Sequence, residues 1–131
     1  KGAFILIADL MRHLHLPACL DSIHCLSYPH GSKSDLTIKG VGELEIVGRH
    51  VLVVDDIFDT GETLSEVVSQ IQKNNPASIK SLVLLSKDVP HQTDYRPDIA
   101  LFDIEDRFVV GCGLDYKEYY RGLPDIYAIE I

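Results

Sequence analysis

Two stretches of the chain carry apolar residues at helical spacing. In residues 1–16 the apolar side chains stand at positions 4, 7, 8, 11 and 14, with 6 and 10 widening the face. This pattern predicts a mostly buried helix that ends before Pro17. The second repeat consists of Leu64, Val67, Val68 and Ile71. It predicts an amphipathic helix from about Thr63 to a stop signal at residues 73–76, opened by a capping box formed by Thr63 and Glu66.

Strand-like segments alternate with these helices. Residues 51–55 and 78–85 are nearly continuous apolar runs, typical of buried parallel strands, whereas residues 19–28 alternate loosely between apolar and polar side chains. Residues 36–46 suggest a short hairpin, and the remaining short strand candidates are residues 99–102, 108–110 and 126–131. The alternation predicts an α/β fold whose central, mostly parallel sheet is covered by helices on both faces.

Polar residues follow the predicted strands at their carboxyl ends, where ligands of such sheets bind. These residues are Ser27, Tyr28, Asp55, Asp56 and Lys87. Their shared location predicts a single binding site at one edge of the sheet.

Composition narrows the class of protein. The 131 residues predict one domain, and 46% of them are apolar, enough for a core. A net charge of −8 argues against broad nucleic-acid binding, and no apolar run approaches the length of a membrane span. Three cysteines without CxxC spacing indicate reduced thiols. We therefore expect a cytoplasmic protein that has neither nucleic acid nor membrane as a partner.

The stretch from Val51 to Leu64 carries the chemistry. A buried strand leads into Asp55-Asp56, and an acidic loop then continues through Asp59 and a Thr-Gly-Glu-Thr turn into a helix. A glycine-containing loop at a helix N-terminus offers free backbone N–H groups to a phosphate. The preceding carboxylates would repel a phosphate, so we expect them to serve ribose hydroxyls and a divalent cation instead. The ligand should therefore combine sugar, phosphate and metal.

This stretch resembles the phosphoribosyl-diphosphate (PRPP) motif of the type I phosphoribosyltransferases. A response-regulator receiver domain also has adjacent acids after a strand, but there the motif opens the domain, and here about fifty residues precede it. The tail from Asp106 to Arg121, with Phe-Val-Val-Gly followed by Gly-Leu-Asp-Tyr and an Arg, is similar to the hypoxanthine-guanine phosphoribosyltransferases in particular. The opening Lys1-Gly2 and the pair Ser27-Tyr28 match the same family.

The resemblance implies a type I phosphoribosyltransferase fold, with a small hood formed partly by the C-terminal segment, and a reaction in purine salvage. In that reaction 5-phosphoribosyl passes from PRPP to N9 of hypoxanthine or guanine with Mg²⁺, giving IMP or GMP and pyrophosphate. Asp55 and Asp56 would hold the ribose hydroxyls and help to orient Mg²⁺. Asp59 would act as the general base at N7. The 5′-phosphate would be cradled by Thr60, Gly61, Glu62 through its backbone, and Thr63.

The remaining implied roles concern the base and pyrophosphate. Lys87 would hydrogen-bond the 6-oxo group, Phe108 would stack on the purine, and backbone groups of Val109 and Asp115 would contact its edge. Asp115 would also reach Mg²⁺ bound to pyrophosphate. Pyrophosphate itself would contact Arg121 and the backbone of Lys1 and Gly2, while Ser27 and Tyr28 would sit on a closing loop.

Two departures and one alternative accompany the resemblance. Glu62 stands where relatives often have a basic or apolar residue, and its charge is unfavourable beside a phosphate unless the side chain points away. The resemblance also implies that residues 1–131 are a single phosphoribosyltransferase domain without the usual N-terminal segment. Apolar and tyrosine-rich edges further suggest a homodimer or homotetramer. The alternative is a non-catalytic nucleotide-binding regulator on the same fold, although a regulator would not need Asp59, Lys87, Asp115 and Arg121 together.

Overall fold

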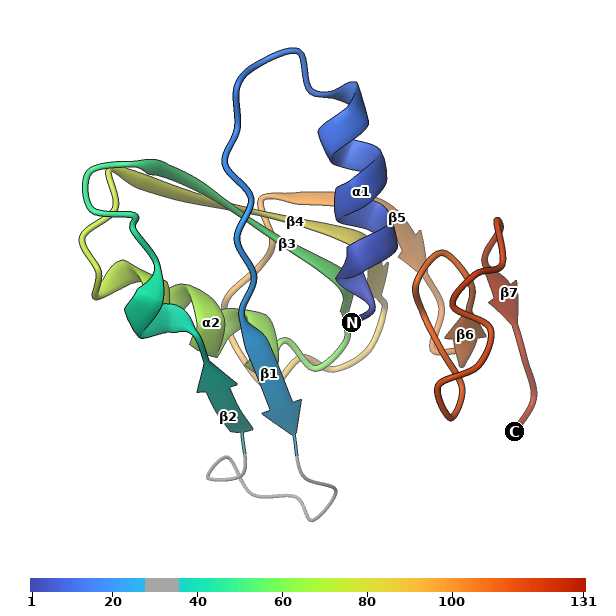
Figure 1. The fold of residues 1–131 in the computed structure, drawn as a ribbon. Helices are drawn as coiled ribbons and strands as arrows, with labels where there is room; N and C mark the ends of the chain where they lie inside the picture. Colours follow the sequence, from blue (N-terminus) through green and yellow to red (C-terminus); the bar gives the residue numbers. More distant parts are fainter. Residues whose placement is uncertain (28–35) are drawn as a thin grey trace.

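A three-stranded parallel sheet forms the centre of the molecule (Figure 1). The computed structural model describes residues 1–27 and 36–131, so Tyr28 lies outside the described residues. The sheet has the order β3 (His50–Phe58), β4 (Ser78–Lys87), β5 (Ile99–Ile104). β4 is the most buried of the three, with Ser81, Val83 and Leu85 almost inaccessible to solvent. The prediction of a parallel sheet built from apolar runs is therefore confirmed, although all three strands are longer than predicted.

One helix lies on each face of this sheet, as predicted. α1 (Ala3–His13) packs on one face of β3, and α2 (Glu62–Gln72) packs on the other (Figure 1). The apolar stripe of α2 is buried, with Leu64, Val67 and Ile71 against the sheet. The prediction that α1 is mostly buried is wrong, because none of its residues is buried and Phe4 is 59% exposed. Only part of its wide apolar face meets the sheet.

The N-terminal strands form a separate antiparallel pair. β1 (His24–Ser27) pairs with β2 (Leu36–Lys39), so β1 lies outside the parallel sheet to which the alternation had assigned it. The predicted hairpin within residues 36–46 is also wrong, since β2 is followed by a 3-10 helix, η2 (Val41–Glu43). Gly40 has a φ of 96° and turns the chain out of β2 there. This pair packs against α2 through Ile23, Cys25 and Ile38.

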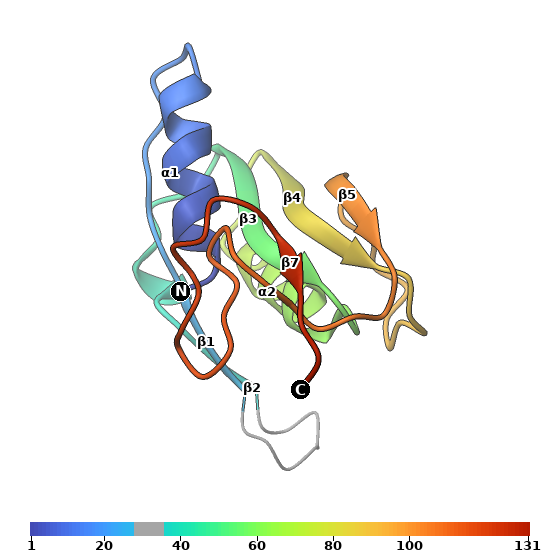
Figure 2. The ribbon, with the colours of Figure 1, turned by 90° about the vertical axis from the view of Figure 1, so that its right-hand side faces the viewer.

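The C-terminal segment forms a small unit beside the sheet and next to the N-terminus (Figure 2). β6 (Val109–Val110) pairs with β7 (Tyr127–Ala128), which confirms both predicted strands in shorter form. Val109 and Leu114 pack with Leu84 and Leu85 of β4, so this unit shares the core of the sheet.

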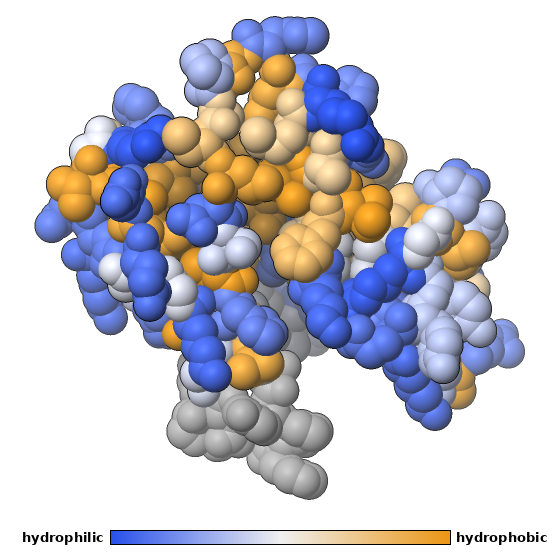
Figure 3. Space-filling model, in the orientation of Figure 1, coloured by the Kyte–Doolittle hydropathy of each residue, from blue (hydrophilic) through white to orange (hydrophobic). Residues whose placement is uncertain are grey.

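Exposed apolar side chains gather over α1 and the neighbouring strands (Figure 3). Those of the two elements α1 and β3 include Phe4, Ile5 and Leu52. In residues 1–27 and 36–131 we find no helix with both the length and the apolar character needed to cross a bilayer.

Candidate active site

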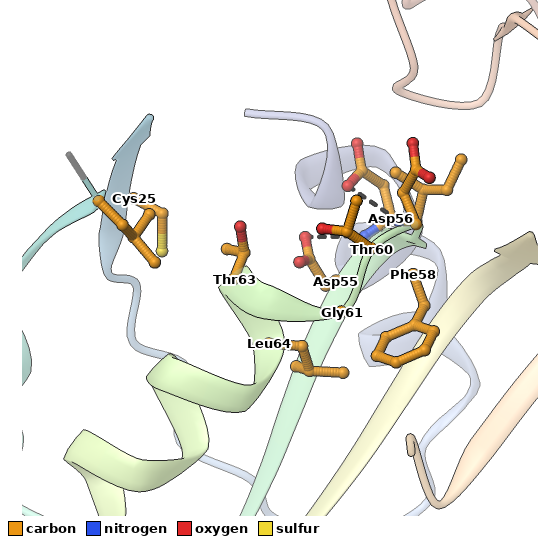
Figure 4. A pocket seen from close by; sticks show the side chains of 11 residues that line it. Cys25, Asp55, Asp56, Phe58, Thr60, Gly61, Thr63 and Leu64 are labelled. Atoms are coloured by element: carbon orange, nitrogen blue, oxygen red, sulfur yellow. Dashed lines mark hydrogen bonds between the residues drawn. The ribbon is translucent and has the colours of Figure 1, made fainter. Parts of the chain in front are cut away.

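A cavity of about 260 Å³ opens at the carboxyl ends of the parallel strands (Figure 4). Residues 55–61 line it together with Thr63 and Leu64, so one continuous stretch from β3 to α2 supplies most of the wall. Cys25 of β1 and Leu36 of β2 close the opposite side. The sequence predicted the acidic and phosphate-loop members of this set, whereas Cys25 and Leu36 enter through the antiparallel pairing of β1 with β2.

Asp55 lies within β3 as predicted, and Asp56 also lies within the strand and not in a loop after it, which corrects the prediction. Asp55 still pairs with Val83 of β4, and the strand continues to Phe58. The Asp55 carboxylate accepts from the backbone N–H of Asp56 at 3.0 Å, and the Asp56 carboxylate accepts from Ile57 in the same way at 3.0 Å. Their fixed place in a strand makes this part of the site rigid.

Two adjacent acids in this position strain each other electrostatically. Burial, and next the negative charge of Asp56, raises the pKa of Asp55 to about 7. Burial, and next the charge of Asp55, also raises the pKa of the Cys25 thiol, which keeps that thiol protonated. The cavity floor therefore favours a bound cation or hydroxyl donors that would relieve the repulsion.

The loop from Asp59 to Gly61 ends at the N-terminus of α2. The helix begins at Glu62 with Gly61 as its N-cap, and no side chain caps it. The predicted capping box at Thr63 and Glu66 is therefore wrong, because the N-cap position is occupied by Gly61, two residues before Thr63. Gly61 has a φ of 87°, which favours glycine. The uncapped first turn directs backbone N–H groups at the cavity, the arrangement that binds phosphate.

Lys87 brings a positive charge to the acidic loop. It is the last residue of β4 and not the residue beyond the strand, and its side chain is only 12% exposed. Its ammonium lies 3.4 Å from the Asp59 carboxylate and 3.6 Å from that of Asp106. No sequence pattern indicated a role for Asp106, because its contact with Lys87 depends on how the C-terminal unit packs against the sheet.

A second cluster of charges joins the two ends of the chain. Arg121 pairs with Asp115 at 2.9 Å and with Glu118 at 3.1 Å, and Lys1 pairs with the same Glu118 carboxylate at 2.9 Å. Hydrogen bonds from Lys1, and next from Arg121, lower the pKa of Glu118. Glu118 was not predicted as a site residue, since only the fold brings Lys1 near it.

Gly2 connects this cluster to the acidic cavity. A side chain on Gly2 would overlap the Asp56 carboxylate. Gly113, with a φ of 101°, approaches so closely that its own side chain would overlap the Gly2 carbonyl. Arg121 donates to the Gly113 carbonyl at 2.7 Å and holds this loop in place. The Arg121 Nε is buried and has no hydrogen-bond partner among the described residues.

The remaining predicted residues are distributed as follows. Phe108 is 37% exposed and packs edge-on against Tyr116, with the ring centroids 5.7 Å apart. Val109 is buried in β6 and pairs with Ala128. Ser27 ends β1, opposite Leu36. The Glu62 carboxylate meets Gln92 and is not part of the cavity lining.

A divalent cation at this site would need ligand atoms from the bound substrate in addition to those of the protein. Within residues 1–27 and 36–131, no three His, Cys, Asp or Glu side chains are grouped closely enough to hold a metal alone. Mg²⁺ is commonly bound through one or two carboxylates together with substrate phosphates. The pair Asp55 and Asp56 fits that mode, and so does Asp115 beside Arg121.

Comparisons with known proteins agree with this geometry. The family model of the phosphoribosyl transferase domain matches residues 1–117. The chain is 41% identical to the hypoxanthine-guanine phosphoribosyltransferase of Aquifex aeolicus, over 99% of this chain and 74% of that protein. It is 36% identical to the Homo sapiens enzyme of the same name, over 98% of this chain and 64% of that protein.

The solved structures give the same result. A Trypanosoma cruzi hypoxanthine phosphoribosyltransferase in complex with the product IMP matches with a TM-score of 0.90 and 35% identity. That match covers 99% of this chain and 71% of the other. The fold, the acidic strand end and the phosphate loop all fall within the matched region. The chain therefore belongs to the phosphoribosyltransferase family and, within it, to the hypoxanthine-guanine phosphoribosyltransferases.

Proposed function

We propose that the protein transfers the 5-phosphoribosyl group of PRPP to N9 of hypoxanthine or guanine, giving IMP or GMP and pyrophosphate in purine salvage. The proposal rests on three features that lie close together at the carboxyl ends of the parallel strands. Adjacent carboxylates and an uncapped helix N-terminus line a single cavity, and Lys87 is ion-paired with Asp59 of its wall. A ligand with ribose, 5′-phosphate and a 6-oxopurine complements these three features in that order.

The ribose phosphate is held by the stretch from β3 to α2. Asp55 and Asp56 accept hydrogen bonds from the ribose hydroxyls. The backbone N–H groups of Thr60, Gly61, Glu62 and Thr63 and the two threonine hydroxyls bind the 5′-phosphate. Because both groups of residues belong to one rigid strand–loop–helix unit, C1′ of the ribose has a fixed position for attack.

The purine is held between β4 and the C-terminal unit. Lys87 donates to the 6-oxo group, and adenine lacks an acceptor there, so an unpaired buried ammonium disfavours adenine. Phe108 stacks on the ring, and backbone groups of Val109 and Asp115 contact its edge. Asp59 takes the N7 proton as N9 attacks, and the exchange of Lys87 from Asp59 to the purine frees this carboxylate to act as base.

The leaving pyrophosphate is neutralised by the second cluster. Arg121 and the backbone of Lys1 and Gly2 bind it. Bound Mg²⁺ would supply charge neutralisation of pyrophosphate and would be held by Asp55, Asp56 and Asp115 together with substrate oxygens. The family resemblance assigns to Ser27 and Tyr28 the exclusion of water from the reacting centre, and Tyr28 lies outside the described residues.

The test is a coupling assay that supplies PRPP and Mg²⁺ with hypoxanthine, guanine, xanthine or adenine in turn. We expect turnover of hypoxanthine or guanine and none of adenine. GMP binding without any turnover would instead favour the alternative function, a nucleotide-binding regulator. A folded sample that neither turns over nor binds GMP would contradict both.

Assembly and location complete the proposal. The exposed apolar residues of α1, β3 and β5 support self-association as a homodimer or homotetramer. The three cysteines are unpaired, which fits a reducing cytoplasm.

A further inference from the structure

The loop between β4 and β5 is fastened to the phosphate loop by three contacts. The backbone N–H of Gln92 donates to the Thr60 carbonyl at 2.8 Å. The Thr93 hydroxyl donates to Ser65 of α2 at 3.1 Å. Thr93 also lies so close to Gly61 that a Cβ there would stand 2.6 Å from the Thr93 methyl group. The segment from Gln92 to Thr93 is therefore packed directly behind the loop that binds phosphate.

The side chain of Gln92 makes a further contact, with Glu62. The end of the Gln92 amide that faces the carboxylate lies 3.1 Å from Oε2 and 3.2 Å from Oε1, and we assign it as the nitrogen because only that orientation satisfies both groups. The opposite orientation of the amide would set its carbonyl oxygen against two carboxylate oxygens. Both oxygens of Glu62 are thus satisfied by one donor on the side of the helix that does not line the cavity.

This contact reduces the electrostatic repulsion that the Glu62 carboxylate would exert on a bound phosphate. Glu62 is the first residue of α2, so its backbone N–H belongs to the phosphate site while its side chain carries a negative charge. A carboxylate free to rotate at this position would repel a phosphate dianion a few ångströms away. The Gln92 amide offers the carboxylate a fixed place elsewhere, and the backbone bond to Thr60 fixes the amide in turn.

We propose that Gln92 is a positioning residue, which holds the Glu62 carboxylate away from the 5′-phosphate site and so permits an acidic residue in the phosphate loop. The inference rests on the proposed function only in that the uncapped N-terminus of α2 binds a phosphate monoester. Gln92 does not line the cavity, and it acts through Glu62.

The test uses Gln92→Ala, Glu62→Gln and the double variant. Gln92→Ala removes the amide and keeps the backbone N–H that bonds Thr60. We expect its KM for PRPP to rise about fivefold to tenfold, while kcat changes less than twofold. In the double variant the carboxylate is gone, so the loss of Gln92 should cost less than twofold in KM relative to Glu62→Gln. Asp94→Asn, which removes an exposed acid from the same loop, is the matched control.

Ribose 5-phosphate binding, measured by calorimetry, provides a readout that does not depend on turnover. Its affinity should follow the same pattern across the four variants, with unchanged melting temperatures. An equal loss from Gln92→Ala in the presence and absence of the Glu62 carboxylate would overturn the proposal, as would no loss at all. If ribose 5-phosphate binds but no purine is coupled, the proposed transferase activity fails while the role of Gln92 is still decided by binding.

Discussion

Two regions of the site differ in how the chain builds them. The cavity around Asp55, Asp59 and Gly61 comes from one continuous stretch, with its strand and helix adjacent in sequence. The cluster of Lys1, Glu118 and Arg121 joins residues 117 positions apart and exists only once the C-terminal unit docks. The first region holds an excess of negative charge, whereas the second balances its cations with its own carboxylates.

This difference in charge indicates which region depends on a bound ligand to relieve electrostatic repulsion. In the acidic cavity, the pKa of Asp55 is raised to about 7 mainly by burial and next by Asp56, so the apo state is electrostatically unfavourable. In the second cluster Glu118 already satisfies Lys1 and Arg121. We therefore expect substitutions in the cavity to affect chemistry and pH dependence, and substitutions in the cluster to affect pyrophosphate and PRPP binding.

The largest effect should come from Asp59→Asn in the acidic cavity. Removing a general base typically lowers kcat by a factor of about 10² to 10⁴, and we expect about 10³ here, with KM for hypoxanthine changed only a few-fold. Single-turnover kinetics with PRPP in excess would measure the chemical step. The melting temperature serves as control, because Asp59 is half exposed and contributes little to folding. A variant that retains kcat within tenfold would show that another group accepts the N7 proton.

Arg121→Met should give the next largest effect. It would disrupt the cluster of Lys1, Glu118 and Arg121 and leave the acidic cavity intact. The variant loses the bonds to Asp115 and to the Gly113 carbonyl, and it leaves those acceptors partly buried. Charge-assisted hydrogen bonds contribute about 1.5–3 kcal/mol each, so we expect kcat/KM for PRPP to fall by about 10².

Arg121→Lys is the matched control, since it keeps the charge but not the fork that reaches both Gly113 and Asp115. Binding of ribose 5-phosphate, measured by calorimetry, should be unaffected in both variants. A parallel loss of ribose 5-phosphate binding would mean that the two regions are not separable.

The sequence predicted the first region far better than the second, for a physical reason. The apolar run, the acids and the Thr-Gly turn act over a few residues, so pattern alone placed Asp55, Asp59 and Gly61 in one pocket. The errors there were local, such as the capping box, which the left-handed Gly61 replaced as the start of α2. The pairing of β1 with β2 was missed because strand partners are chosen by tertiary contacts.

Side-chain contacts between residues far apart in the sequence could not be predicted from the sequence pattern. The contact of Lys87 with Asp106, and that of Gln92 with Glu62, depend on how two loops pack after folding. Arg121 and Asp115 were predicted as site residues by family resemblance, yet the pairing of Glu118 with both Lys1 and Arg121 was not. A polar residue in a loop carries no periodic signal, so its partner emerges only from the assembled fold.

Asp55→Asn should remove the contribution of this carboxyl group to the pH dependence of the free energy of unfolding. Because the folded pKa of about 7 lies above the ordinary value of 3.8, the protonated form is favoured in the folded state. The stability contributed by this group is fully present below about pH 4 and is lost as the pH rises through 7. Above pH 7 the variant should therefore be more stable than the wild type, by on the order of 2 kcal/mol.

Urea denaturation at pH 5 and pH 8 would measure this difference. The extra stability of the variant should decrease as the pH falls. Catalysis should be lost at both pH values because the contacts of Asp55 with the ribose are gone. A stability difference that is the same at pH 5 and pH 8 would exclude Asp55 as the titrating group. Cys25→Ser, which changes the cavity wall without altering its charge, provides the control.

The smallest effect should come from Glu118→Gln, and its sign decides how the second region works. Glu118 is exposed, and its carboxylate shares both Lys1 and Arg121, the groups that we assign to pyrophosphate. If it competes with the ligand, its neutralisation should tighten pyrophosphate inhibition by about twofold to threefold, with less effect at high salt, where exposed charges are screened. If it positions the two cations instead, inhibition should weaken by a similar factor. We expect competition, because Asp115 and the Gly113 carbonyl already orient Arg121 without help from Glu118.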